Sequence, residues 1–253
     1  MDKQLIQYLK TIIIQAGEKS IKARKQGLKI IIKQDNSPVT NVDKEISDFI
    51  FEKLTKILPN IPVVCEERTI QNINNQEQFW LIDPIDGTRS YIENSDHFTI
   101  NIALIINNIV EYGFIYIPIT KMLYYTDEHK KLVIEKNNQI IPPNIHQKDE
   151  YIAVVSSRNM DILVENYLAE NQLNNILSIP SSIKLCLVAE SACDVYPKFG
   201  NTMEWDIAAG HALIKATGGN VMTLDDFELE YNKPNFLNPS FIAANQRWLM
   251  RSC

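Results

Sequence analysis

The 253-residue sequence has no paired cysteines and no long apolar run, and each absence argues against a class of protein. Its four cysteines form neither a CxxC pair nor a zinc-finger spacing; they are Cys65, Cys186, Cys193 and Cys253. The first three lie in apolar stretches, which favours buried free thiols and a reducing compartment. No segment approaches the roughly 18 consecutive apolar residues that a membrane-spanning helix needs.

Basic residues are scarce relative to acidic ones. The 25 lysines and arginines face 31 aspartates and glutamates, so the net charge is −6. A general binder of nucleic-acid polymers would be basic, and we therefore disfavour that class. The N-terminal stretch 5–14 is interrupted by polar residues and lacks a cleavage site, so we expect no secretory signal. The prediction is a cytoplasmic protein, monomer or homodimer, with peripheral contact to the inner membrane left open.

Apolar spacing predicts the arrangement of secondary structure. Helical periodicity covers 5–27 and 40–58, where Thr40 and Asp43 form a capping-box pair. Antiparallel strands are expected over 98–106, 109–117 and 122–126. From residue 151 onward, strands alternate with helices, which indicates a layered α/β (α+β) architecture.

The polar, proline-containing stretch 127–150 divides the sequence. We expect a hinge there, between an N-terminal α+β lobe (1–150) that carries most metal ligands and a C-terminal α/β lobe (151–253). No internal repeat and no low-complexity segment is visible.

The densest chemical signal follows a buried strand that ends at Ile82. Asp83 and Asp86 come next, separated by Pro84 and Ile85, and Gly87 follows them. Carboxylates at the end of a buried strand are costly unless a partner neutralises them. Pro84 fixes φ and Gly87 permits a strained turn, so the bend would aim two carboxylates and the Ile85 carbonyl at one point. Hard divalent cations prefer such oxygen ligands.

Two further acidic groups have weaker individual signals. Glu66 and Glu67 follow a short apolar strand and repel one another unless a cation lies near. Asp206 lies in the first turn of a predicted helix, where the helix dipole favours an anion. Alone, the first pair could be a solvated loop and Asp206 a simple cap; a lone D-x-x-D is also more often a turn. The parallel placement of the two strand-end acid clusters favours a shared metal site, whereas capping alone is the safer reading of Asp206.

These motifs resemble the inositol monophosphatase superfamily, in the right order along almost the whole chain. The blocks that carry the resemblance are residues 35–43, Glu66-Glu67, 83–88 and 205–210. Within the superfamily, other stretches resemble 3′(2′),5′-bisphosphate nucleotidases of the CysQ type. Those stretches are residues 98–105, 181–190, 196–200 and 237–239.

The resemblance implies a five-layer αβαβα sandwich and phosphomonoester hydrolysis with two or three Mg²⁺ ions. It implies a metal site formed by Glu66, Asp83 and the Ile85 carbonyl, and a second formed by Asp83, Asp86 and Asp206. It also implies that Glu66 and Thr88 position the attacking water, with Asp43 in the same network. Substrate contacts are expected from a set of residues along the chain: Glu66, Ile85, Asp86, Gly87, Thr88, Ser181, Ser182, Lys184, Lys198 and Asp206.

The substrate that the resemblance favours is 3′-phosphoadenosine 5′-phosphate, a small nucleotide bisphosphate whose hydrolysis to AMP would clear a by-product of sulfate activation. Lithium sensitivity would accompany it. A phosphatase of inositol or sugar monophosphates and an inactive binding protein remain alternatives. Pro180, Arg68 and Arg89 depart from the usual pattern and leave the nucleotide contacts open.

Overall fold

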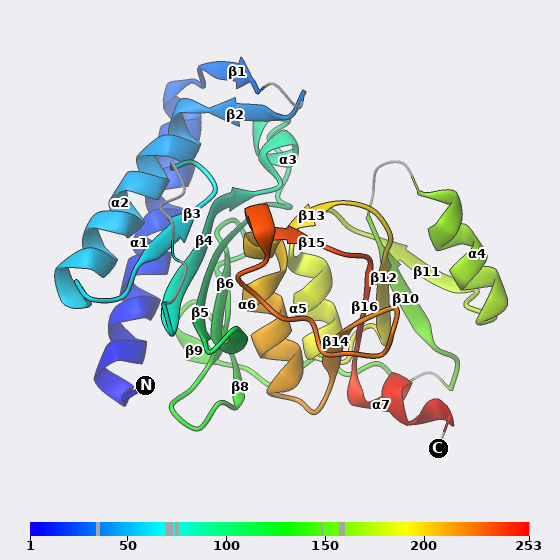
Figure 1. Ribbon diagram of the computed structural model, residues 1–253. Coiled ribbons are helices and arrows are strands. Elements are labelled where there is room, and N and C mark those ends of the chain that lie inside the picture. The colour runs from blue at the N-terminus through cyan, green and yellow to red at the C-terminus, as the bar shows by residue number, and fades with distance from the viewer. Residues whose placement is uncertain (34–35, 69–72, 74–75, 148, 157–159, 253) are drawn as a thin grey trace.

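The computed structural model describes residues 1–33, 36–68, 73, 76–147, 149–156 and 160–252. Across these ranges the chain forms five layers in the order αβαβα, as the resemblance implied (Figure 1). None of the helices in this part of the chain combines the length and the apolar character that crossing a bilayer would take.

The larger sheet has seven strands in the order β3-β4-β5-β6-β7-β8-β9. Only the β3–β4 pair is parallel among its described pairings. The strands span β3 (Val63–Cys65), β4 (Gln78–Asp86), β5 (Thr99–Ile106), β6 (Ile109–Ile117), β7 (Met122–Thr126), β8 (Leu132–Lys136) and β9 (Gln139–Ile140).

The smaller sheet has five strands in the order β11-β10-β12-β16-β14. Its strands span β10 (Ile152–Val155), β11 (Asn175–Ser178), β12 (Val195–Lys198), β14 (Asn220–Thr223) and β16 (Phe241–Ala244). The strand β10 pairs in parallel with both neighbours, whereas β16 pairs antiparallel with β12 and β14. A short ladder, β13 (Thr202–Met203) with β15 (Leu237–Asn238), lies outside both sheets.

Three helical layers sandwich the two sheets. The outer layers are α1 (Lys3–Gln26) with α2 (Asn41–Ile57), and α4 (Ile162–Glu170) with α7 (Gln246–Leu249). The central layer is α5 (Ile183–Ala189) with α6 (Glu204–Lys215). Alternation along β4 explains the packing, because successive side chains point to opposite faces: Trp80 and Ile82 pack toward α1 and α2, and Phe79 and Leu81 pack toward α5 and α6.

The stretch 127–150, where we expected a hinge, contains β8 and β9, which complete the larger sheet. The division of the chain into two lobes stays a prediction. Glu135 on β8 contributes to the polarity of this stretch, yet it is buried in the structure. Its Oε1 accepts hydrogen bonds from Lys10 Nζ at 2.6 Å and from the Tyr125 hydroxyl at 2.9 Å. These donors offset the cost of burying a carboxylate.

Other elements match the sequence more closely. The capping box of α2 is confirmed, since Thr40 Oγ1 accepts from Val42 N–H and Asp43 Oδ2 accepts from Thr40 N–H. Cys65, Cys186 and Cys193 are buried and free, as expected, while Cys253 lies outside the described residues. The first helix after residue 151, where alternating strands and helices were expected, spans Ile162–Glu170. The short helix α3 (Thr88–Ile92) was not predicted.

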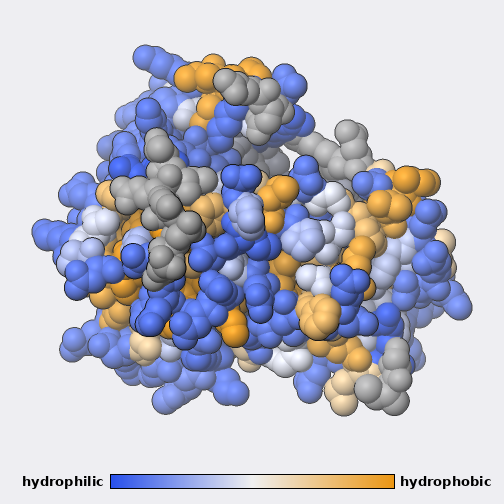
Figure 2. Space-filling view, viewed as in Figure 1, coloured by the Kyte–Doolittle hydropathy of each residue, from blue (hydrophilic) through white to orange (hydrophobic). Residues whose placement is uncertain are grey.

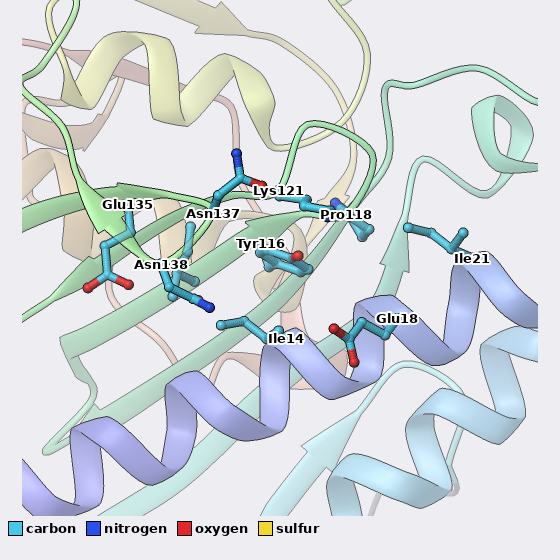
Figure 3. A pocket seen from close by; sticks show the side chains of 10 residues that line it. Ile14, Glu18, Ile21, Tyr116, Pro118, Lys121, Glu135, Asn137 and Asn138 are labelled. Atoms are coloured by element: carbon cyan, nitrogen blue, oxygen red, sulfur yellow. The ribbon is translucent and has the colours of Figure 1, made fainter.

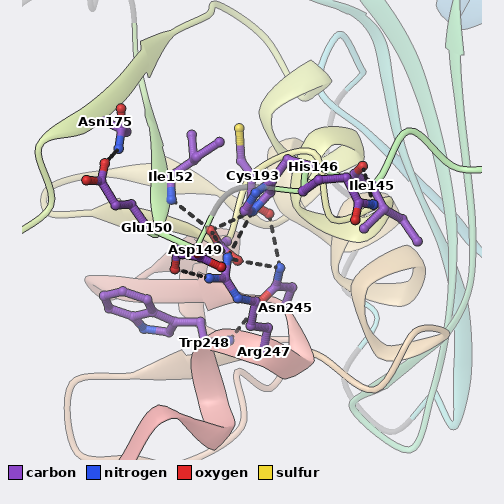
Figure 4. Close-up of polar contacts among 12 residues, drawn as sticks. Ile145, His146, Asp149, Glu150, Ile152, Asn175, Cys193, Asn245, Arg247 and Trp248 are labelled. Carbon is purple, nitrogen blue, oxygen red and sulfur yellow. Dashed lines mark hydrogen bonds and ion pairs between the residues drawn. The ribbon is translucent and has the colours of Figure 1, made fainter.

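A buried carboxylate also ties the C-terminal helix to the smaller sheet. Asp194 is fully buried and accepts from Ile152 N–H at 2.7 Å, from Asn245 Nδ2 at 3.1 Å and from Arg247 Nη1 at 3.3 Å. Asn245 and Arg247 flank the start of α7, and Figure 4 shows them beside the segment that contains Ile145 and His146. This cluster fixes the N-terminal end of β12, the strand whose other end carries Lys198.

Candidate active site

The end of β4 forms the centre of the candidate site. The pairing of β4 with β5 shifts register between Asp83 and Asp86, where Pro84 interrupts the ladder. Asp83 Oδ1 accepts from Ile85 N–H at 3.1 Å, which holds the bend. Gly87 then adopts φ +86°, and a Cβ there would lie 3.1 Å from the His97 carbonyl oxygen. The bend therefore requires glycine at this position.

Thr88 opens α3 and joins the bend to α2. Its hydroxyl lies 3.1 Å from Asp43 Oδ1 and 3.1 Å from the Ile85 carbonyl oxygen, and it can donate to either. The other oxygen of Asp43 is held by Thr40 N–H at 2.8 Å and Thr40 Oγ1 at 2.5 Å. Burial raises the pKa of Asp43, and the hydrogen bonds from Thr40 oppose that rise. The predicted association of Thr88 with Asp43 is thus present.

Glu66 follows β3 and contacts Lys33, a residue that no sequence pattern singled out. Lys33 Nζ lies 2.9 Å from Glu66 Oε1 and 2.6 Å from Glu67 Oε1. Burial raises the pKa of Glu66 to about 7, and the Lys33 ammonium opposes the rise. The repulsion expected between the two glutamates is therefore relieved by a cation from the protein itself.

Lys33 is delivered by the hairpin of β1 (Ile30–Ile32) and β2 (Pro38–Thr40). All three β1 isoleucines are exposed, with Ile31 at 63%. Figure 2 shows this apolar strip at the top of the molecule, where Figure 1 places β1. The hairpin is joined to the body of the protein through the buried Thr40 cap of α2 and through the contacts of Lys33 with Glu66 and Glu67.

Asp206 enters the site from the central layer. It occupies the first turn of α6, and its Oδ2 accepts from Met203 N–H at 2.8 Å. The capping role considered from the sequence is therefore real. Capping is not its sole contact, because Asp206 also lines a cavity together with Asp86 from β4.

The four predicted carboxylates influence one another strongly. Burial, then the charge of Glu66, then those of Asp86 and Asp206, hold the pKa of Asp83 well above its usual range. Burial followed by the charges of Asp86 and Glu66 does the same for Asp206. Burial also raises the pKa of Asp86, and Lys184 is the main opposing charge. Acids from the larger sheet and from the central helical layer thus form one region of concentrated negative charge.

The donor chemistry of this region fits Mg²⁺. All of its predicted side-chain ligands are carboxylates, and mutual repulsion among buried carboxylates is what a divalent cation relieves. As the side chains stand, no three His, Cys, Asp or Glu groups within the described ranges are arranged closely enough to hold a metal ion. Each carboxylate instead has a protein donor: Lys33 for Glu66, Ile85 N–H for Asp83, Ser182 N–H for Asp86 and Met203 N–H for Asp206. The ligand set therefore stays a prediction.

A cavity of about 160 Å³ adjoins the carboxylates. Six of the predicted site residues line it: Asp86, Ser181, Ser182, Lys184, Lys198 and Asp206. Five residues that we did not predict complete the wall: Ser156, Leu185, Tyr196, Thr202 and Ile207. Tyr196 belongs to the Tyr-Pro-Lys stretch that supported the resemblance, so that motif could have identified it.

Lys184 is the principal cation of this cavity. It is buried, and its Nζ donates to the Ser181 carbonyl oxygen at 2.6 Å. Burial lowers the pKa of Lys184 to about 8, while the charge of Asp86 opposes that shift and Lys198 reinforces it. Two lysines therefore lie beside two aspartates in one small cavity.

A second cavity, of about 280 Å³, lies between α1 and the ends of β6, β7 and β8. Figure 3 shows Glu18 and Tyr116 at its wall, with Asn137 and Asn138 from the turn after β8. It contains none of the predicted site residues. The predicted chemistry is confined to the region around the end of β4.

Comparisons with known proteins agree with this geometry. The family model described as the inositol monophosphatase family matches residues 1–252. The chain is 37% identical over 214 residues to the 3′(2′),5′-bisphosphate nucleotidase CysQ of Salmonella typhimurium, covering 83% of this chain and 86% of that protein. It is 34% identical over 222 residues to the protein of the same name from Buchnera aphidicola, covering 86% and 84%.

A solved structure provides an independent comparison. The crystal structure of CysQ from Bacteroides thetaiotaomicron, a bacterial member of the same family, has a TM-score of 0.81 and 32% sequence identity. The match covers 97% of this chain and 98% of that chain. With the five-layer architecture, the strand-end carboxylates and nearly the full length matched, this chain belongs to the inositol monophosphatase family.

Proposed function

We propose that this protein is a phosphatase of the 3′(2′),5′-bisphosphate nucleotidase type, which hydrolyses 3′-phosphoadenosine 5′-phosphate to AMP and inorganic phosphate. The observation that carries the proposal is the cavity in which Asp86 and Asp206 adjoin Lys184 and Lys198. Paired carboxylates suit a divalent cation and the reacting phosphate, while the two ammonium groups suit a second phosphate. The names of the two relatives from Salmonella typhimurium and Buchnera aphidicola support the same substrate class.

The proposed cofactor is Mg²⁺, two or three ions held by Glu66, Asp83, the Ile85 carbonyl, Asp86 and Asp206. Bound there, Mg²⁺ would neutralise charge on the phosphoryl group and increase the acidity of water. Each ionised carboxylate has about four lone-pair sites, so it could face the cation and still accept from its protein donor. The resemblance to this family implied Mg²⁺, and the acidic ligand set supports the same cofactor.

The protein's own groups then have separate roles. Water attacks phosphorus, the bond from phosphorus to the ribose 3′ oxygen breaks, and that oxygen leaves with a proton. Thr88 can donate its hydroxyl proton to Asp43, which leaves a lone pair on Thr88 Oγ1 for a hydrogen bond from the attacking water. Glu66 is the second group proposed to orient or deprotonate the water. The backbone amides of Gly87 and Thr88 are proposed to meet the phosphate.

Lys184 and Lys198, with Ser181 and Ser182, are proposed to bind the phosphate that does not react. This arrangement would discriminate against substrates with a single phosphate, because the buried Lys184 and the half-buried Lys198 would then lack a phosphate partner. Lithium sensitivity, a role in sulfur metabolism and a cytoplasmic location are part of the same proposal.

The decisive experiment is a substrate panel. Phosphate release is measured from 3′-phosphoadenosine 5′-phosphate, inositol 1-phosphate and a sugar monophosphate, each with Mg²⁺, with EDTA and with added Li⁺. We expect kcat/KM for the bisphosphate to exceed the others by at least about tenfold, and EDTA to abolish activity. A preference for inositol 1-phosphate would favour the alternative substrate, and full activity in EDTA would refute the metal proposal.

A further inference from the structure

Asn101 on β5 is buried beside the candidate site and has an incomplete set of hydrogen bonds. It pairs directly with Asp83 across the β4–β5 ladder, and its side chain is 1% exposed. Directly opposed side chains in an antiparallel pair lie on the same face of the sheet. The Nδ2 group of Asn101 has no hydrogen-bond partner among the described residues. A buried amide donor without a partner is destabilising, and its presence calls for an explanation.

Three consecutive contacts connect Asn101 to Asp86. Asn101 Oδ1 lies 2.8 Å from Ser182 Oγ. Ser182 Oγ lies 2.6 Å from Thr99 Oγ1, and Thr99 Oγ1 lies 3.4 Å from Asp86 Oδ2. Thr99 and Asn101 occupy alternate positions on β5, so both side chains point to the same face.

The number of protons determines how this chain of contacts can work. Each hydroxyl supplies one proton, and an ionised carboxylate supplies none. With the Oδ1 atom of Asn101 toward Ser182, three contacts share only the two protons of Ser182 and Thr99. One of the three contacts would then be an oxygen facing an oxygen with no proton between them.

Turning the Asn101 carboxamide by 180° resolves both problems. The nitrogen and oxygen of an amide are distinguished by their hydrogen-bond partners, so either orientation is compatible with the same side-chain position. Nδ2 then donates to Ser182 Oγ, Ser182 donates to Thr99, and Thr99 donates to Asp86. Three contacts receive three protons, all in one direction, and the unpartnered atom becomes a carbonyl oxygen instead of an N–H group.

We propose that Asn101 is a positioning residue, the first donor in a hydrogen-bond chain from Asn101 through Ser182 and Thr99 to Asp86. The chain fixes the rotamer of the Asp86 carboxylate. The backbone N–H of Ser182, which also donates to Asp86, fixes it from the same turn. This inference rests on the assignment of Asp86 as a metal ligand in the proposed function. Groups that orient a ligating carboxylate typically change metal affinity or activity about 10- to 100-fold when removed.

The first test measures Mg²⁺ binding by isothermal titration calorimetry on the intact protein, without substrate. Thr99→Val removes the hydroxyl and keeps the shape, whereas Thr99→Ser keeps the hydroxyl. Asn101→Leu removes the amide with little change in volume. We expect Thr99→Val and Asn101→Leu to weaken Mg²⁺ binding about tenfold or more, and Thr99→Ser to stay within about threefold of the wild type.

The matched control is Thr126→Val, which removes a buried hydroxyl from β7 of the same sheet. That hydroxyl accepts from Gly113 N–H and contacts no site carboxylate in the described structure. We expect unchanged Mg²⁺ binding in this variant. If Thr99→Val and Asn101→Leu bind Mg²⁺ as Thr126→Val does, the positioning role is refuted.

Two further measurements test separately the metal-ligand role of Asp86 and the orientation of the Asn101 amide. Asp86→Asn is titrated with Mg²⁺ in parallel. If this variant binds Mg²⁺ normally, the assignment of Asp86 as a ligand is wrong. If Asp86→Asn loses Mg²⁺ binding and the Thr99 and Asn101 variants do not, only the role of Asn101 is overturned. In nuclear magnetic resonance spectra of the wild type, the turned amide predicts contacts between the Asn101 Hδ2 protons and the Ser182 Hβ protons. Contacts from Hδ2 away from Ser182 would contradict it.

Discussion

The hydroxyl of Thr88 lies 3.1 Å from the Oδ1 atom of Asp43, 45 residues earlier in the chain. The same carboxylate caps α2 through its other oxygen, which accepts from Thr40. One buried acid therefore both completes a helix N-terminus and holds the side chain proposed to orient the attacking water. Because the helix cap fixes Asp43, Thr88 is oriented by rigid secondary structure instead of a loop.

The first prediction concerns this hydroxyl. Thr88→Val should lower kcat about 10²- to 10⁴-fold, because the water loses its acceptor while the side-chain shape is retained. Thr88→Ser keeps the hydroxyl and should retain most of the activity. Steady-state kinetics with 3′-phosphoadenosine 5′-phosphate at saturating Mg²⁺ provide the test. A Thr88→Val enzyme within threefold of wild type would remove Thr88 from the mechanism.

The second prediction concerns Asp86 and Asp206. Asp86→Asn and Asp206→Asn should each lower turnover by orders of magnitude and leave the fold intact. In EDTA, the melting temperature of Asp206→Asn should equal or exceed that of wild type, because repulsion from Asp86 and Glu66 is relieved. The stabilisation that Mg²⁺ confers on the wild type should decrease in both variants. Near-normal turnover in both at saturating Mg²⁺ would defeat the metal assignment.

The third prediction uses the pKa of Lys184, which burial lowers to about 8. Lysine is charged below its pKa, so its attraction for a phosphate is present at pH 7 and lost as pH rises through about 8. KM for the bisphosphate should therefore rise between pH 7.5 and 9. In Lys184→Arg this rise should disappear, since arginine stays charged. Lys53→Met on α2 is the control and should follow the wild-type profile; an identical profile in Lys184→Arg would exclude Lys184 as the cause.

The fourth prediction concerns stability. His211 on α6 is buried, with Nδ1 at 2.9 Å from the Tyr231 hydroxyl and Nε2 at 3.0 Å from Asn220 Oδ1. Asn220 Oδ1 can only accept, so Nε2 carries the proton and Nδ1 accepts from Tyr231. These partners suit the neutral ring, and burial lowers the pKa of His211 to about 4.

The sign of the pH effect follows from this depressed pKa. Between pH 6.5 and about 4 the unfolded chain binds a proton at His211 that the folded chain does not, so stability falls as pH falls through this window. The loss from this residue reaches about 3 kcal/mol at most. Denaturant unfolding at pH 7 and pH 5 should show a smaller loss in His211→Gln than in wild type. An imidazole that titrates near 6.5 in folded-state NMR spectra would contradict the assignment.

The sequence by itself determined much of this protein. The strand-end position of Asp83 and Asp86, the capping pair of Thr40 and Asp43 and the apolar periods of α1 and α2 are local features, and local chemistry is readable from residue order. The order of the motifs along the chain supported the family assignment, because each motif specifies a local bend, cap or turn. Glu135 on β8 is an exception. Its charge is typical of a loop, but Lys10 and Tyr125, which are distant in the sequence or on a neighbouring strand, hydrogen-bond to it in the folded protein.

Tertiary structure alone decided which residues meet. Lys33 reaches Glu66, and the Ser182 N–H reaches Asp86 across 96 positions of sequence. Neither contact has a periodic or compositional signal. Side-chain pairing between distant segments depends on how whole layers stack, and the central helices bring together groups from both sheets. Residue order specifies the helices and strands. Which side chains pair where these elements meet depends on the free-energy cost of burying a charge without a partner.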